Sequence, residues 1–322
     1  MNVLYLGHGR IGCMCLRKLV DAGINVKGVL SRVTDRNNGA VDTESSVFNL
    51  SQTLRLRFFD VSNPNDPEFI KLLGKMQLDY IISIQYDRIL GGDLLKVPGI
   101  GSINLHFSPL PLFRGCYPTK WAILKGLISG VTLHLIDEGI DTGKIILQKK
   151  CEIKPDDTDL TLYHSLESIG EELFQEFLDR VKTDSLPKPK EQESSSASYY
   201  RKEEPLGRFI NWAQNSEQVS RMLRAYTFPP FPSARTYIRG REVQLRFPFK
   251  IESNTSEEHL MRKAGSFYIN FNTNELIAKC GSGEYFRFKE VFLDGLEVTP
   301  KVFSRQIDLK AGRFDNREGV RR

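Results

Sequence analysis

Two strand residues and one loop residue carry side chains suited to acid–base chemistry. Asn104 and His106 alternate along a strand-like run, so they share one face of a strand that leads into a proline-held loop. Asp141 follows in an acid-rich loop, in which Gly139 and Gly143 permit tight turns. A lone histidine on a strand is more often structural than catalytic. The asparagine two residues before it and the acidic loop downstream favour a catalytic role here.

These residue types are typical of acyl transfer to an amine. His106 can take the proton of the attacking nitrogen as a general base, because imidazole titrates near neutral pH. Asp141 would orient that base and stabilise its charged form. The side-chain NH2 of Asn104 would donate to the oxyanion that forms on the carbonyl carbon. No serine or cysteine nucleophile is required, because the amine itself attacks.

Strand-like and helical runs alternate in the first part of the chain. This alternation predicts an α/β fold, with a Rossmann-like, mostly parallel sheet and helices on both faces. Ligands of such sheets bind outside the carboxyl ends of the strands, where Asn104 and His106 would lie. The expected strands are 2–6, 26–31, 56–59, 79–84, 103–106, 130–136 and 145–153, and the expected helices are 11–22, 47–53, 67–76, 118–125 and 158–181.

The composition shifts after the last of these helices. Residues 182–198 contain two prolines, several charges and three consecutive serines, as in an exposed linker. Further on, one helix and a series of short strands predict a small β-barrel or sandwich. These elements are the helix 216–226 and the strands 234–238, 243–247, 265–270, 275–278 and 285–292. We expect a catalytic domain at 1–190, a linker at 191–204, a β-rich domain at 205–310 and a polar tail at 311–322.

The composition sets limits on the class of protein. Of the 322 residues, 40% are hydrophobic and 26% charged, as in an ordinary globular protein. A net charge of +5 is too mild to indicate a polyanion partner, although it suits an anionic small molecule. The five cysteines show neither metal-ligand nor disulfide spacing, so we expect no metal site and a reducing compartment. No targeting segment or long apolar run is apparent, which favours a cytoplasmic protein without a membrane partner.

A glycine motif follows the first expected strand. Gly7-His8-Gly9-Arg10-Ile11-Gly12 has the GxGxxG pattern of dinucleotide-binding sites, at the point where a strand leads into a helix. The acidic residue expected at the end of the second strand is missing, because that strand runs into Arg32. We therefore interpret the motif as a tight strand-to-helix turn, with Arg10 placed to meet an anionic substrate.

Three separated motifs carry a resemblance to a known family. Asn104-x-His106, the run Ser108–Gly115 and the D-E-G-I-D-T-G run ending at Gly143 resemble, in the same order, the folate-dependent formyltransferases. That group includes glycinamide ribonucleotide, methionyl-tRNA and sugar-nucleotide N-formyltransferases. Residues 209–212, 223–225 and 232–234 resemble the C-terminal domain shared by methionyl-tRNA and aminoarabinose formyltransferases.

The resemblance implies a formyl donor, 10-formyltetrahydrofolate, and assigns roles by motif position. Asn104, His106 and Asp141 match the catalytic trio of the family. The second domain resembles an OB-like barrel. The folate would lie against two backbone segments, one formed by Gln85, Tyr86, Asp87, Arg88 and Ile89 and the other by Ile136, Asp137, Glu138 and Gly139.

Two acceptors remain open, the amino group of a nucleotide-linked sugar and the aminoacyl end of an initiator tRNA. The tRNA enzymes carry a basic loop after the second strand, suited to phosphate contacts. Here the corresponding loop, Val33–Ser46, holds three acids and one arginine. We therefore favour a small-molecule nucleotide sugar and no nucleic-acid partner. The candidate sugar-nucleotide contacts are Arg10, Ser108, Arg114, Tyr117 and Lys120.

Basic residues of the second domain keep the tRNA alternative open, although they could equally form a solvated rim. They include Arg221, Arg224, Arg235, Arg239 and Arg241. A folate- or nucleotide-binding module that kept the fold without activity is a second alternative. The sequence does not fix the oligomeric state, and a homodimer is the assembly considered.

Overall fold

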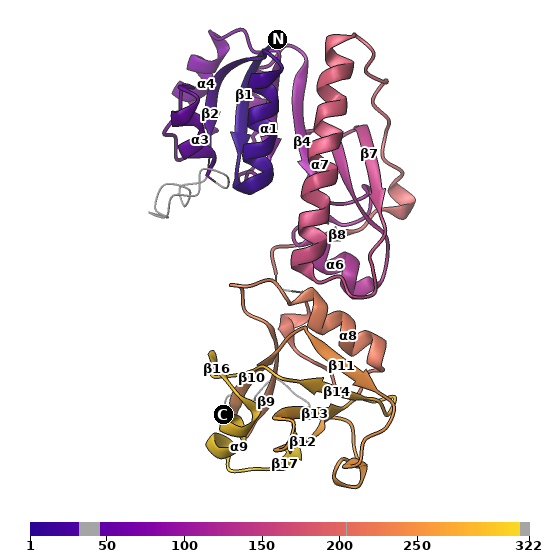
Figure 1. Cartoon of the computed structure of the whole chain (residues 1–322). Coiled ribbons are helices and arrows are strands. Elements are labelled where there is room, and N and C mark those ends of the chain that lie inside the picture. Colours follow the sequence, from indigo (N-terminus) through magenta and orange to yellow (C-terminus); the bar gives the residue numbers. More distant parts are fainter. Residues whose placement is uncertain (32–45, 204, 316–322) are drawn as a thin grey trace. The chain divides into compact units, whose positions relative to one another are not determined.

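The computed structural model describes residues 1–31, 46–203 and 205–315, which form two compact units (Figure 1). The first unit comprises Met1–Pro118, Ile128–Glu152 and His164–Arg201. The second comprises Thr119–Leu127, Ile153–Tyr163 and the chain from Lys202 onward. Two short segments from the first half of the chain thus pack with the second unit, which composition alone does not indicate. The loop 33–45, on which the argument against tRNA draws, lies outside the described residues.

A six-stranded sheet forms the centre of the first unit, in the order β2-β1-β3-β4-β6-β7. The first four strands in this order are parallel to one another, and the β4–β6 and β6–β7 pairs are antiparallel. The prediction of a mostly parallel α/β sheet is therefore confirmed. The strands are β1 (Asn2–Gly7), β2 (Asn25–Leu30), β3 (Tyr80–Ile84), β4 (Gly101–His106), β6 (Ser129–Leu135) and β7 (Ile145–Cys151).

Helices cover both faces of this sheet, since the strands are apolar on both sides. On one face, Phe69 and Leu73 of α4 pack with Leu4 and Ile81 of the sheet. On the other face α7 lies against β4, because a Cβ at Gly170 would be 3.1 Å from the Leu105 side chain. The helices of this unit are α1 (Gly9–Asp21), α3 (Val47–Thr53), α4 (Pro67–Gly74), α5 (Gly92–Leu95) and most of α7 (Asp159–Lys182), whereas nearly all of α6 (Pro118–Lys125) belongs to the second unit. In the described part of the chain, none of the helices has the length and apolarity needed to cross a bilayer.

The glycine motif forms the turn between β1 and α1. Gly9 has φ +67°, a conformation that costs glycine little. Gly12 allows the helix to approach the strand, because a Cβ there would be 3.3 Å from the main chain of Gly7. The hydroxyl of Tyr5 donates to the carbonyl oxygen of Gly12 at 2.5 Å. Chain geometry and packing thus account for these glycines without a dinucleotide.

Two antiparallel sheets form most of the second unit, in agreement with the predicted small β-rich domain. Their orders are β16-β15-β10-β9 and β11-β14-β13-β12-β17. Trp212 is fully buried and stacks on Phe314, which fixes the core of the unit. The elements are α8 (Ser216–Ala225), β9 (Ala234–Ile238), β10 (Arg241–Leu245), β11 (Phe249–Glu252), β12 (Ser266–Asn270), β13 (Glu275–Lys279), β14 (Tyr285–Phe288), β15 (Val291–Leu293), β16 (Leu296–Val298), α9 (Pro300–Ile307) and β17 (Ala311–Arg313).

Several elements differ from the sequence expectations. The expected strand 56–59 makes one isolated bridge, between Phe58 and Val29. The expected strand 285–292 is divided into β14 and β15, and the first residues of the expected tail form β17. The segment expected as an exposed linker instead pairs with the first unit, where β8 (Tyr199–Tyr200) lies beside β5 (Arg114–Gly115). These contacts are main-chain hydrogen bonds, which leave no hydrophobic pattern in the sequence.

Candidate active site

Two of the candidate catalytic side chains, Asn104 and His106, lie where β4 and β6 run side by side. In this antiparallel pair Asn104 is directly opposite His134, and His106 is directly opposite Thr132. Directly opposed residues in such a pair point to the same face of the sheet, so four polar side chains gather there. The Thr132 hydroxyl donates to the Ser108 carbonyl oxygen at 2.7 Å and accepts from the Leu110 N–H at 3.2 Å. Thr132 therefore fixes the start of the loop that follows β4.

His106 is held in one tautomer by the loop after β4. Its Nε2 lies 3.0 Å from the carbonyl oxygen of Phe113, which can only accept, so Nε2 carries a hydrogen. The other ring nitrogen, Nδ1, lies 3.6 Å from Oδ2 of Asp141. His106 is 8% exposed. In the neutral ring, Nδ1 is therefore the atom that can accept a proton, with a carboxylate beside it.

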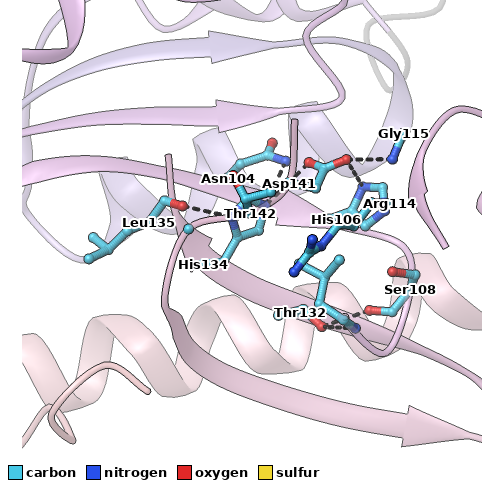
Figure 2. Close-up of polar contacts among 12 residues, drawn as sticks. Asn104, His106, Ser108, Arg114, Gly115, Thr132, His134, Leu135, Asp141 and Thr142 are labelled. Carbon is cyan, nitrogen blue, oxygen red and sulfur yellow. Dashed lines mark hydrogen bonds and ion pairs between the residues drawn. The ribbon is translucent and has the colours of Figure 1, made fainter. Parts of the chain in front are cut away.

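Asp141 connects three parts of the site (Figure 2). Its Oδ2 accepts a hydrogen bond from the Gly115 N–H at 2.8 Å, and its Oδ1 lies 3.5 Å from Nε2 of His134. Burial by itself raises the pKa of Asp141, but the nearby imidazoles of His106 and His134 and the hydrogen bond from the Gly115 N–H outweigh it. The pKa of Asp141 therefore lies well below its ordinary value, and the carboxylate stays ionised at neutral pH.

His134 sets the orientation of the Asn104 amide. Its Nδ1 lies 2.7 Å from the Leu135 carbonyl oxygen and so carries a hydrogen, which leaves Nε2 bare in the neutral ring. The Nδ2 of Asn104 lies 3.2 Å from that Nε2 and donates to it. One N–H of the Asn104 amide is thus used, and the second remains for another acceptor.

The arrangement can support nucleophilic attack on a carbonyl carbon. Nδ1 of His106 can accept a proton, and Asp141 favours the resulting cation because their charges are opposite. The second N–H of Asn104 can donate to a developing oxyanion. The three residues expected to carry the chemistry are therefore brought together, and each is in a state suited to the role expected of it.

The two segments expected to contact folate lie next to each other. Gly92, just beyond the first segment, is so close to the second that a Cβ there would be 3.1 Å from the Glu138 carboxylate. Tyr86 and Ile136 pack against the same apolar cluster. The hydroxyl of Tyr86 is buried and has no hydrogen-bond partner among the described residues. A polar ligand could supply that partner, so these segments fit a pterin-like group.

Main-chain groups of these segments are positioned by local hydrogen bonds. Oδ1 of Asp137 accepts from the Gly139 N–H at 3.1 Å and from the Thr142 hydroxyl at 2.6 Å. Gln85 has φ +56°, which turns the chain sharply where β3 ends. Ile89 is 71% exposed. The folate roles of these residues stay predictions.

The five candidate sugar-nucleotide contacts occupy different environments. The exposed Arg10 guanidinium lies 3.7 Å from the buried Glu167 carboxylate. Ser108 is 1% exposed and donates to the Leu112 carbonyl oxygen at 2.7 Å, an arrangement that favours loop bracing over ligand contact. Tyr117 has φ +57° in the same loop.

The remaining two candidates are already engaged by other side chains. Arg114 donates from Nε and Nη2 to Oε1 of Gln192, at 3.1 and 2.8 Å. Lys120 belongs to the second unit, where its ammonium pairs with the buried Asp159 carboxylate. Contacts of these five residues with a substrate stay predictions.

Two residues of the site were missed by sequence reasoning. His134 could have been found, because an antiparallel pair of β4 and β6 places it opposite Asn104. Gln192 gave no such signal, since it lies in a polar, serine-rich segment far along the chain. Within the described residues, no group of three or more His, Cys, Asp or Glu side chains is arranged to hold a metal ion.

Comparisons with known proteins identify relatives over both halves of the chain. Residues 1–178 match the family described as formyl transferase, and residues 204–306 match the formyl transferase C-terminal domain. The methionyl-tRNA formyltransferase of Halothermothrix orenii is 30% identical over 317 residues, which cover 97% of this chain and 99% of the relative. The bifunctional polymyxin resistance protein ArnA of Wigglesworthia glossinidia brevipalpis is 31% identical over 244 residues, which cover 76% of this chain and 37% of that protein.

A solved structure has a similar fold. It is the N-formyltransferase from Helicobacter canadensis in complex with folinic acid and dTDP-3-aminofucose. The match has a TM-score of 0.68 at 21% identity, and it covers 89% of this chain and 98% of the other. The match to the formyl transferase family covers more than half of the sequence and therefore assigns the chain to a family. This chain belongs to the formyl transferase family.

Proposed function

We propose that this protein transfers a formyl group from 10-formyltetrahydrofolate to a primary amine. The observation that carries the proposal is a network of four side chains: Asn104, His106 and His134 lie on one face of β4 and β6, and Asp141 reaches both histidines from the loop after β6. The amine nitrogen attacks the formyl carbon, and the Asn104 amide donates to the oxyanion of the tetrahedral intermediate. His106 takes the amine proton at Nδ1 and returns it to N10 of the folate as the C–N10 bond breaks. The products are the N-formyl amine and tetrahydrofolate.

The acceptor we propose is the amino group of a nucleotide-linked sugar. A polyanion such as tRNA would need unpaired basic side chains, yet most candidate arginines of the second unit are engaged. Arg224 is 5% exposed and donates to the Asp157 carbonyl oxygen at 2.8 Å. Arg239 donates to the Ile307 carbonyl oxygen at 3.1 Å. The other three pair with carboxylates, as Arg221–Glu217, Arg235–Glu242 and Arg241–Asp294.

A second acceptor is favoured by one specific observation. The relative from Halothermothrix orenii, named a methionyl-tRNA formyltransferase, aligns along nearly the whole of both chains. Charged initiator methionyl-tRNA is therefore the alternative acceptor. Surface ion pairs are worth only about 0–1 kcal/mol each, so phosphates could compete for those arginines. The choice between the two acceptors therefore needs a direct assay.

The deciding experiment incubates the protein and 10-formyltetrahydrofolate with amino-sugar nucleotides or with charged initiator methionyl-tRNA. We expect formylation of an amino-sugar nucleotide and little of the tRNA. Efficient tRNA formylation without any sugar formylation would overturn the proposed acceptor while leaving the formyl transfer intact.

A His106→Asn variant tests the reaction itself. We expect about a hundredfold loss of transfer, the usual contribution of a general base. An unchanged rate in this variant would contradict the assigned base. A parent protein that transfers formyl to neither acceptor would instead favour a binding module without activity.

A further inference from the structure

The segment between α7 and the second unit returns to the catalytic loops of the first unit. Lys190 exchanges two main-chain hydrogen bonds with Ile145, both at 2.8 Å. Further along, the Ser198 carbonyl oxygen accepts from the Arg114 N–H at 2.9 Å, and the Tyr200 carbonyl oxygen accepts from the Cys116 N–H at 2.9 Å. We call residues 190–200 the strap. One end of the strap is thus attached to the start of β7, just after the loop of Asp141, and the other end to the loop after β4.

Gln192, near the start of the strap, joins the loop after β4 to the loop of Asp141 through a single side chain. Its Oε1 accepts from Nε and Nη2 of Arg114, in the loop after β4. Its Nε2 donates to the carbonyl oxygens of Asp141 and Gly143, at 2.8 and 2.7 Å. Arginine can only donate and carbonyl oxygens can only accept, so the chemistry of the partners fixes which way the amide points.

The loop that Gln192 holds contains a strained and tightly packed turn. Asp141 has φ +53°, a left-handed conformation that is strained for a residue with a side chain. Gly143 packs so closely that a Cβ there would be 1.8 Å from the Leu135 carbonyl oxygen. Two hydrogen bonds from the Gln192 side chain to main-chain carbonyl oxygens, on either side of Thr142, oppose relaxation of this turn. The position of the Asp141 carboxylate beside His106 depends on the turn being kept.

We propose that Gln192 is a positioning residue for formyl transfer, which holds Asp141 against His106 and His134 by tying the Asp141 loop to the loop of Arg114. The proposal rests on the proposed function, because it assigns the role through the catalytic trio. Gln192 itself contacts the main chain of Asp141 and not the reacting atoms. Its effect should therefore appear in the rate of the chemical step rather than in folate affinity.

Two substitutions separate the two halves of the contact. Gln192→Glu keeps an acceptor for Arg114 but replaces the donor NH2 with an oxygen that faces two carbonyl oxygens. Gln192→Leu is apolar and removes both halves. The matched control is Glu191→Gln in the same strap, which breaks only the exposed ion pair of Glu191 with Lys144.

We expect kcat to fall about tenfold to a hundredfold in both Gln192 variants, since a misplacement of about 1 Å can cost a hundredfold. The KM for 10-formyltetrahydrofolate should change less than twofold, and Glu191→Gln should match the parent. If Gln192→Glu keeps the parent kcat, bracing of Arg114 is enough and the proposal is wrong.

Histidine ¹⁵N spectra provide a readout that needs no activity. The chain has five histidines, so the signals of His106 and His134 can be assigned by substitution. We expect these two signals to shift in Gln192→Leu and to stay in place in Glu191→Gln. Unchanged signals, or a displacement of all five that marks general loosening, would overturn the positioning role. If the parent transfers no formyl group, the proposed function fails, and the spectra still decide whether Gln192 positions Asp141.

Discussion

The carboxylate of Asp141 accepts a hydrogen bond from the main-chain N–H of Gly115 at 2.8 Å, although 26 residues separate them. The same Oδ2 lies 3.6 Å from Nδ1 of His106. One oxygen atom therefore joins the loop after β4, the acidic loop and the candidate base. Any change that moves this oxygen should affect both the charge state of the site and the packing of two loops.

Replacement of Asp141 by asparagine tests the charge. Asn can still accept from the Gly115 N–H, so the loop should keep its shape while the negative charge beside His106 is lost. We expect kcat to fall about a hundredfold, because the cation formed at His106 is no longer stabilised. Steady-state kinetics with the formyl acceptor measure the loss. A fall of less than threefold would contradict a role for the carboxylate in the reaction.

The stability of the same variant should depend on pH in a defined direction. The pKa of Asp141 is lowered by folding, so the folded state binds fewer protons than the unfolded state around its unfolded value of about 3.9. The ionised Asp141 carboxylate therefore adds to the free energy of unfolding above its unfolded pKa, and this stabilisation is lost as pH falls through the folded pKa. The free energy of unfolding should therefore differ most between parent and Asp141→Asn at neutral pH. Urea unfolding at pH 7 and pH 3 checks whether the difference narrows in acid.

Gly115→Ala tests the close approach of the strap to the loop after β4. Gly115 has φ +88°, and a Cβ there would be 2.2 Å from the Tyr200 carbonyl oxygen. Gly23 has φ +73° but open space around it, so Gly23→Ala is the matched control for backbone strain alone. We expect the control to lose about 1–2 kcal/mol. Gly115→Ala should lose more stability than the control in denaturant unfolding, and it should also lose activity in kinetic assays. Equal losses of stability in the two variants would contradict the steric argument.

The sequence predicts the central sheet well, and the structure brings Asn104, His106 and Asp141 together; their catalytic roles stay predictions. Buried parallel strands are continuous apolar runs, and the connecting helices have helical periodicity, so most boundaries lie within one or two residues of those observed. Asn104 and His106 alternate on such a strand, and this alternation alone places them on one face. Their convergence with Asp141 follows from the sheet edge at which the loops meet.

The parts that sequence analysis missed depend on main-chain contacts. The strap has low hydrophobicity, and the hydrogen bonds of β8 come from main-chain atoms that every residue type possesses. The short strands β11 and β16 and the split between β14 and β15 lack a long alternating pattern. Gln192 could be found only once the two loops that it joins were located in space.

The pair of His134 and Asn104 predicts a non-additive effect on activity. Asn104→Ala removes the oxyanion donor and should lower kcat about a hundredfold. His134→Leu keeps the donor but frees the amide to rotate, and we expect about a tenfold loss. The double variant should be little worse than Asn104→Ala, because His134 acts through Asn104. A double-mutant cycle on kcat measures this coupling, and additive losses would show that His134 acts independently.

The last prediction concerns Lys120 and Asp159, a pair of nearly buried charges in the second unit. Their side chains are 12% and 3% exposed, and the Thr119 hydroxyl also donates to the Asp159 carboxylate. Lys120→Met leaves that carboxylate without its cation, so we expect a loss of about 3–5 kcal/mol in urea unfolding. Adding Asp159→Asn should restore part of the stability, because the buried unpaired charge is removed. The KM for the formyl acceptor in the double variant separates the two roles open to Lys120. If Lys120 is purely structural, this KM should be unchanged, whereas loss of a sugar-nucleotide contact should raise it.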